Sequence, residues 1–128
     1  MPQTTFKGTV FSSKGEGRKF ISLPWVKRQI HEKLGFTPYS GTLNMRLTEE
    51  SVRRKKLLKT AQKFEITPKK GYCSGIFIEA HMEGLKCGIV LPQIPNYPQD
   101  VLEIVAARNL RERFKIQDGN EVCVTVRV

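Results

Sequence analysis

The stretch Leu34–Arg46, which reads LGFTPYSGTLNMR, organises the rest of the chain. Its two glycines and its proline predict a tight turn, and the alternation that follows predicts a half-buried strand. Because a strand points successive side chains to opposite faces, Leu43 and Met45 would enter a core while Thr42 and Asn44 project together from the other face. Two such neutral oxygen-bearing groups can hold a hard cation beside phosphates, although an ordinary exposed strand edge would give the same pattern.

The chain has 128 residues, of which 39% are hydrophobic and 27% are charged. A chain of this size buries roughly two-thirds of the surface that its unfolded form exposes, so we expect one folded domain over residues 1–128. No run of about 18 apolar residues exists, so we expect no transmembrane helix. The first residues also lack the apolar core of a secretory signal, and a cytoplasmic location is the simplest expectation.

The three cysteines, Cys73, Cys87 and Cys123, are odd in number and widely spaced. This spacing argues against a disulfide framework and against a Cys-x-x-Cys zinc site. Their neighbours are largely apolar, so we expect buried, reduced thiols.

The formal net charge of +10 favours an anionic partner, which could be nucleic acid, a nucleotide or an acidic membrane surface. Much of the excess lies in Arg53–Lys56 with Lys59, and in Lys69–Lys70. Such runs are also typical of a solvated face, so charge alone does not choose among these partners.

Hydrophobic periodicity and breaker residues predict the remaining elements. One helix, Trp25–Leu34, should begin after Pro24 and end at Gly35, and a second should begin at Thr48. Helical turns are expected at Asn109–Phe114, and tight hairpin-type turns at Glu83–Gly84 and Asp118–Gly119. The predicted strands are Phe6–Phe11, Thr42–Leu47, Tyr72–Met82, Cys87–Leu91, Asp100–Ala107 and Glu121–Val128.

Two segments carry further candidate chemistry. The loop Ser12–Arg18 has two glycines one residue apart with cationic neighbours, which favours phosphate binding, although a lone Gly-x-Gly is usually only a turn. Glu103 interrupts an apolar strand, so its carboxylate must lie on a solvated face or have a partner. Arg108 and Arg111 follow it as candidates for anion contacts, and Pro92, Pro95 and Pro98 predict an irregular loop before it.

Three segments together resemble the archaeal CTP-dependent riboflavin kinases: Lys14–Phe20 (KGEGRKF), Leu34–Asn44 (LGFTPYSGTLN), and Val101–Ala106 (VLEIVA) continuing to Leu110–Arg111 and Asp118–Gly119. Their order and spacing span almost the whole chain. The resemblance implies a compact six-stranded cradle-loop β-barrel, mainly β with short helices, in the α+β class.

The same resemblance implies roles for individual residues. Thr42 and Asn44 would ligate Mg²⁺, and Glu103 would contact the flavin and orient its attacking hydroxyl, as a candidate general base. Pro95 falls at the flavin end, where the family has threonine, and Ser40 replaces the commoner proline. The CTP-binding residues would be Lys14, Gly15, Glu16, Gly17, Arg18, Lys19, Arg108, Asn109, Leu110 and Arg111.

The expected function is therefore the Mg²⁺-dependent transfer of phosphate from CTP to riboflavin, giving FMN and CDP, by a monomeric enzyme. The alternative is a non-enzymatic basic β-barrel that binds nucleic acid or a nucleotide as a regulator. Aromatic residues are not interleaved with the basic clusters, which weakens the case for a protein that stacks on single-stranded nucleic acid.

Overall fold

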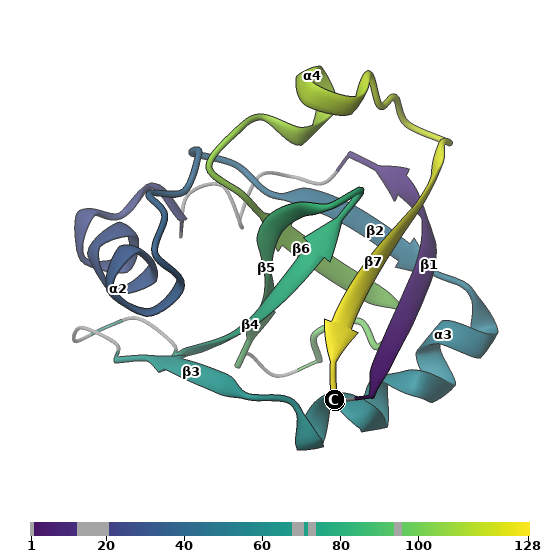
Figure 1. Ribbon diagram of the computed structural model, residues 1–128, viewed down its shortest axis with the longest axis horizontal. Helices are drawn as coiled ribbons and strands as arrows, with labels where there is room; N and C mark the ends of the chain where they lie inside the picture. The colour runs from purple at the N-terminus through teal and green to yellow at the C-terminus, as the bar shows by residue number, and fades with distance from the viewer. Residues whose placement is uncertain (1, 13–20, 68–70, 72–73, 94–95) are drawn as a thin grey trace.

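The structure is a computed structural model that describes residues 2–12, 21–67, 71, 74–93 and 96–128. Figure 1 shows the arrangement of its strands and helices. The strands are β1 (Gln3–Phe11), β2 (Leu43–Leu47), β3 (Lys63–Ile66), β4 (Gly75–Met82), β5 (Leu85–Pro92), β6 (Val101–Val105) and β7 (Glu121–Arg127). The helices are α2 (Pro24–Leu34), α3 (Glu49–Arg54) and α4 (Leu110–Phe114), with a 3₁₀ helix η1 (Lys55–Thr60) after α3.

Within the described part of the chain, six antiparallel strands close into a barrel in the order β4-β5-β6-β2-β1-β7. The barrel closes where β7 meets β4, at the pair His81 and Thr125. The predicted six-stranded barrel with short helices is therefore confirmed. The added strand β3 was not predicted, and it pairs with the first half of β4 on the same edge that β7 meets further along.

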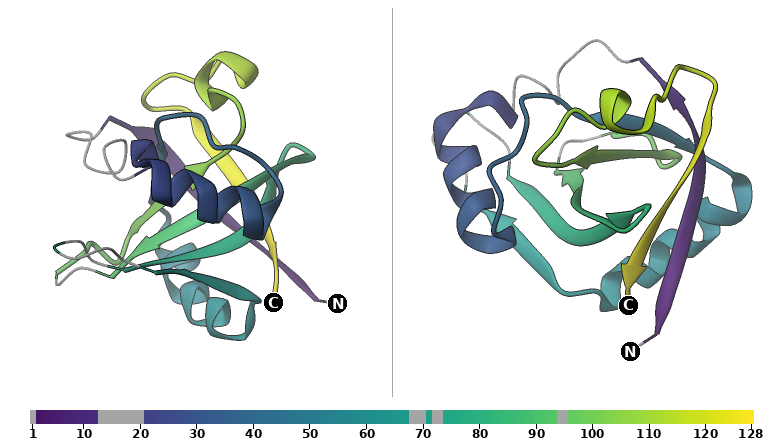
Figure 2. Two further views of the ribbon diagram at one scale, coloured as in Figure 1. Left: turned by 90° about the vertical axis from the view of Figure 1, so that its left-hand side faces the viewer. Right: turned by 45° about the horizontal axis from the view of Figure 1, so that its top comes forward.

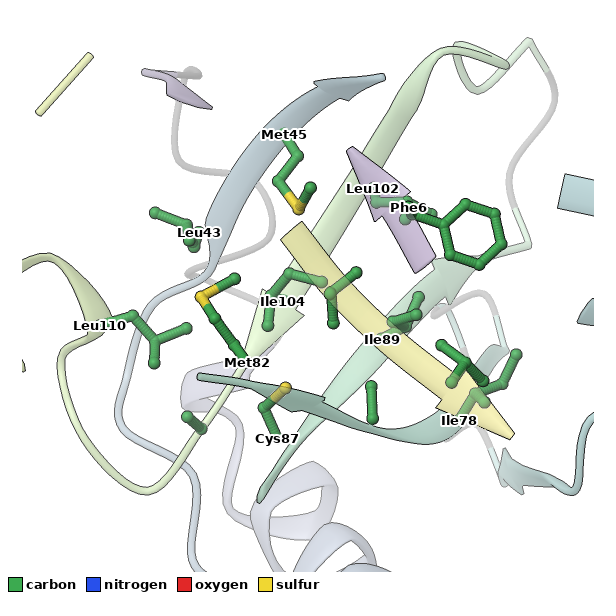
Figure 3. Packing of buried hydrophobic residues seen from close by; sticks show 14 of the residues in the cluster. Phe6, Leu43, Met45, Ile78, Met82, Cys87, Ile89, Leu102, Ile104 and Leu110 are labelled. Atoms are coloured by element: carbon green, nitrogen blue, oxygen red, sulfur yellow. The ribbon is translucent and has the colours of Figure 1, made fainter. Parts of the chain in front are cut away.

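The barrel interior is filled by side chains that alternate along the strands. Figure 3 shows these residues converging from β1, β2, β4, β5 and β6. Met45, Ile89, Leu102 and Ile104 are completely buried, and Leu43 is nearly so. Full burial of one such side chain contributes about 1.5–3 kcal/mol, so this interior is the main source of stability.

Helix α2 packs on the outside of the barrel and builds a second hydrophobic cluster. It begins with Pro24 and ends at Gly35, whose φ of 81° lets its N–H reach the carbonyl of His31 at 3.0 Å, as the sequence predicted. Its apolar face, Trp25, Val26, Ile30 and Leu34, packs with Phe77, Val90 and Val105, which come from β4, β5 and β6. Figure 2 shows α2 lying across these strands.

The two predicted turns have different surroundings. Glu83 and Gly84 have φ values of 49° and 79° and join β4 to β5, so the predicted hairpin is confirmed. Gly119 has a φ of 92°, and its turn leads from α4 into β7 instead of joining two strands. The Gly119 N–H donates to the carbonyl of Val10 at 2.8 Å, which fixes this turn against β1.

The cysteines do not share one environment. Cys87 is buried on β5, and burial, reinforced by the charge of Glu79, raises its pKa to about 12. Cys123 is exposed on β7, so the prediction of a buried thiol was wrong there. Strand alternation places it opposite Lys7, on the outer face of the barrel. Cys73 lies outside the described residues.

Candidate active site

Asn44 on β2 and Glu103 on β6 face each other across an antiparallel strand pair. Both belong to the outer face of the barrel, because Leu43 and Met45 occupy the inner face. Strand β2 pairs with β1 on one side and with β6 on the other, so Asn44 does not lie on an exposed strand edge. Asn44 is 8% exposed and Glu103 is 6% exposed.

Two hydroxyl groups donate to the Glu103 carboxylate. Thr42 Oγ1 donates to Oε1 at 3.0 Å, and Tyr97 Oη donates to Oε2 at 2.5 Å. Glu103 was expected to need either a solvated face or a partner, and the structure gives it two hydrogen-bonding partners. Because Thr42 directs its proton to Glu103, the lone pairs of its oxygen remain for another ligand.

A pocket of about 280 Å³ opens beside this group. It brings together the predicted metal ligands, Thr42 and Asn44, with the predicted nucleotide-binding segment Arg108–Arg111. Its lining is Ser12, Tyr39, Ser40, Gly41, Thr42, Leu43, Asn44, Ile104, Ala106, Arg108, Asn109, Leu110 and Arg111. Residues far apart in the sequence thus share one pocket.

The turn before β2 is held in place on the rim of this pocket. The Tyr39 N–H donates to the carbonyl of Ala106 at 2.7 Å. The ring of Tyr39 is 45% exposed, and its hydroxyl accepts from Asn109 Nδ2 at 3.4 Å. Ser40 Oγ accepts from Lys27 Nζ at 2.7 Å, which ties this turn to α2.

The residues of the segment 108–111 have different structural roles. The Asn109 side chain caps α4 by accepting from the N–H groups of Arg111 and Glu112, at 3.0 and 3.4 Å. Leu110 is buried in the core, and Arg108 is exposed. Side-chain contact with a nucleotide is therefore open to Arg108, whereas Asn109 and Leu110 mainly position the segment.

Arg111 takes part in an anchor at the start of the glycine-containing loop. Its guanidinium lies 2.6 Å from Asp118 Oδ1, and Ser12 Oγ donates to Asp118 Oδ2 at 2.7 Å. These two hydrogen bonds, first that of Ser12 and then that of Arg111, lower the pKa of Asp118. The anchor joins the end of β1 to α4 and to the turn at Gly119.

The remaining predicted site residues, Lys14–Lys19 and Pro95, lie outside the described residues. Ser12, just before that loop, lines the pocket. Tyr97 and Tyr39 were not predicted as site residues, although Tyr97 belongs to the irregular loop predicted from Pro92, Pro95 and Pro98. The unexplained carboxylate in an apolar strand was the signal that could have pointed to Tyr97.

The described residues contain no cluster of three or more histidine, cysteine or acidic side chains that could hold a metal ion. The hydroxyl of Thr42 and the amide of Asn44 line one pocket and offer neutral oxygen atoms. Mg²⁺ binds one or two protein ligands together with phosphate and water oxygens, so this pair fits it better than it fits zinc. No helix in the described part of the chain is long and apolar enough to cross a membrane.

Comparison with known proteins gives a consistent result. A family model for CTP-dependent riboflavin kinases, described as domain of unknown function DUF120, matches residues 10–126. Proteins named riboflavin kinase are 36% identical in Methanococcoides burtonii and 35% in Archaeoglobus fulgidus, over 93% and 94% of this chain. The chain spans 55% and 53% of those two relatives, about half their length. The riboflavin kinase of Ignicoccus hospitalis is 34% identical over 95% of this chain and 70% of its own length.

Proposed function

Because the chain belongs to the family of CTP-dependent riboflavin kinases, we propose that it transfers the γ-phosphoryl group of CTP to the 5′-hydroxyl of riboflavin, giving FMN and CDP. The observation that carries this proposal is that Thr42 and Asn44 line one pocket with Arg108–Arg111, while Glu103 lies behind them as the hydrogen-bond acceptor of Thr42 and the strand partner of Asn44. Neutral metal ligands, a buried carboxylate and nearby cations are what phosphoryl transfer requires, because it depends mainly on alignment and charge neutralisation.

In the proposed reaction, the riboflavin oxygen forms a bond to the γ-phosphorus, and the bond from that phosphorus to the β–γ bridging oxygen breaks. The bond pair leaves with CDP, and Glu103 orients the attacking hydroxyl and accepts its proton. A carboxylate offers about four acceptor positions, so Glu103 can accept a substrate hydroxyl in addition to Thr42 and Tyr97.

Mg²⁺ held by Thr42 and Asn44 would neutralise the charge that develops on the transferred group. Lys14–Lys19 and Arg108–Arg111 would bind CTP, with Arg108 supplying a side-chain charge and Arg111 holding Ser12 through Asp118. Pro95 would lie against the flavin.

We also propose that residues 1–128 form a single catalytic domain that acts as a monomer in the cytoplasm. Support for a single domain comes from the barrel itself, because β1 and β7, from the two ends of the chain, pair over seven residues from Gln3–Arg127 to Thr9–Glu121.

The test is an assay of the purified chain with riboflavin, Mg²⁺ and either CTP or ATP, in which FMN is separated by chromatography and measured by fluorescence. FMN should accumulate with CTP and depend on the metal. Glu79→Gln is a suitable control variant, because Glu79 lies exposed on β4 and pairs with Lys86. Absence of FMN with every nucleotide would overturn the proposal.

A nucleic-acid-binding role rests on net charge alone. In the cluster Arg53–Lys59, Arg53 pairs with Glu49 at 3.5 Å and Arg54 pairs with Glu50, so part of this charge is compensated on α3 itself. Nucleic-acid affinity would fall steeply with salt concentration, which a binding titration at two salt concentrations measures.

A further inference from the structure

Tyr97 makes the shortest contact that the structure gives to Glu103, at 2.5 Å. It lies in the segment between β5 and β6, six residues before Glu103. Through Glu103, the hydroxyl of Tyr97 is connected to the hydroxyl of Thr42, which donates to the other carboxylate oxygen at 3.0 Å. Hydrogen bonds thus link Tyr97, in the loop before β6, through Glu103 to Thr42, the residue that precedes β2.

The backbone around Tyr97 is restrained. Pro98 disfavours the helical region for the residue before it and so favours an extended Tyr97. The Val101 N–H donates to the carbonyl of Pro98 at 3.4 Å. The Leu47 N–H donates to the carbonyl of Asp100 at 2.6 Å, which ties this segment to the end of β2. The segment that follows Tyr97 is therefore tied to the strand that carries Asn44.

The phenol of Tyr97 remains protonated and acts as a donor. Burial, followed by the hydrogen bond to Glu103 and by its negative charge, raises the pKa of Tyr97 far above neutral pH. On β5, the strand partner of Glu103 is Val90, which packs under α2. Thr42 and Tyr97 donate the hydrogen bonds to the Glu103 carboxylate.

From this arrangement we infer that Tyr97 is a positioning residue of the proposed kinase site: it fixes the Glu103 carboxylate so that Oε1 accepts the Thr42 proton and leaves the lone pairs of Thr42 Oγ1 for the metal. This inference rests on the proposed function. Its consequence is that the loop before β6 and the proposed metal ligand Thr42 are both hydrogen-bonded to one carboxylate. Loss of the phenol would therefore disturb metal binding through Glu103 and Thr42.

The test is Tyr97→Phe, which removes one oxygen and keeps the ring. Loss of a group that orients a metal ligand typically costs about 10–100-fold in activity or metal affinity. We expect kcat to fall, and the Mg²⁺ concentration for half-maximal rate to rise, by about that factor. The KM for riboflavin should stay within about threefold, because the ring remains. In a Glu103→Gln background, Tyr97→Phe should have no further effect, since the two residues act as one unit.

The control is Thr125→Val, which removes a hydroxyl whose partner is Thr5 on β1, away from the site. It should leave kcat and the Mg²⁺ requirement unchanged. Wild-type kinetics for Tyr97→Phe would overturn the inference but not the proposed function. The same holds if Tyr97→Phe lowers kcat equally in the wild-type and Glu103→Gln backgrounds, as a purely structural role would.

Calorimetry of metal-dependent CTP binding distinguishes a failure of the inference from a failure of the proposed function. If the wild type makes no FMN but binds CTP with Mg²⁺, the proposed function fails. The inference then stands if Tyr97→Phe raises the Mg²⁺ requirement by about 10–100-fold and falls if the requirement is unchanged. A wild-type protein without metal-dependent CTP binding overturns both.

Discussion

Asn44 and Glu103 are opposite partners on the antiparallel strands β2 and β6, and each is more than nine-tenths buried. A buried carboxylate without donors would be costly, and Thr42 and Tyr97 remove that cost. The site is therefore built into the middle of the sheet and supported by hydrogen bonds that exist before any substrate binds.

Substituting Glu103→Gln should reduce kcat by about 10²–10⁴-fold, because the amide neither accepts the proton of the substrate hydroxyl nor carries a negative charge. Steady-state kinetics of FMN formation measure the effect. The same change at Glu79, which is exposed and pairs with Lys86, should leave the rate unaltered. Equal rates for Glu103→Gln and the wild type would remove Glu103 from the mechanism.

Asn44→Ala should abolish metal-dependent turnover, because alanine supplies no oxygen for Mg²⁺. The rate measured against Mg²⁺ concentration tests this expectation, and circular dichroism verifies that the barrel still forms. A variant that retains the wild-type Mg²⁺ dependence would exclude Asn44 as a metal ligand.

Gly8→Ala should destabilise the barrel by about 1–3 kcal/mol. A Cβ at this position would lie 2.7 Å from the carbonyl oxygen of Arg46, which is backbone of the neighbouring strand β2 and cannot move by itself. Unfolding in urea measures the loss. Gly88→Ala is the comparison, because its closest contact, at 2.9 Å, is the end of the Leu34 side chain. A larger loss at Gly88 than at Gly8 would contradict this account.

Asp118→Asn should lower stability at neutral pH and have little effect in acid. The pKa of Asp118 is below its ordinary value of 3.8 because of Ser12 and Arg111. Its stabilising contribution is therefore fully present above about pH 3.8 and is lost as the pH falls through the lower pKa of the folded protein. Tm values of wild type and variant at pH 7 and pH 2.5 provide the comparison. An undiminished Tm difference at pH 2.5 would argue against the ion pair.

Alkylation should distinguish the two described cysteines. With a pKa of about 12, the thiol of Cys87 is ionised to about one part in ten thousand at pH 8, and it is also buried. Iodoacetamide should modify the exposed Cys123 in the folded protein and reach Cys87 only after unfolding. Peptide mapping by mass spectrometry detects each product, and rapid modification of Cys87 in the native state would refute this environment.

Local signals predicted much of the fold. Pro24 and Gly35 marked the ends of α2, because each residue type has a backbone geometry suited to its position. Alternation along Leu43–Leu47 gave the correct inner residues of β2. Strand β3 was missed because four residues with little periodicity depend on the free edge of β4 for their structure.

Contacts within the site were harder to predict. Alternation placed Thr42 and Asn44 on one face, but the two flanking strands that bury Asn44 come from distant parts of the chain. The partners of Glu103 and Arg111 depend on how loops return to the barrel. Tyr97 and Asp118 were both visible in the sequence, yet only tertiary structure brings their side chains to those partners.

The alternation of Leu43, Asn44 and Met45 has a consequence for protein engineering. A proposed metal ligand and core side chains occupy neighbouring positions of one short strand, so random mutagenesis of β2 will seldom separate loss of activity from misfolding. A library in residues 13–20 or 93–96 changes neither β2 nor Tyr97, so substrate range is better altered there. Libraries confined to those segments would leave the supporting strand pair unchanged while exploring new acceptors.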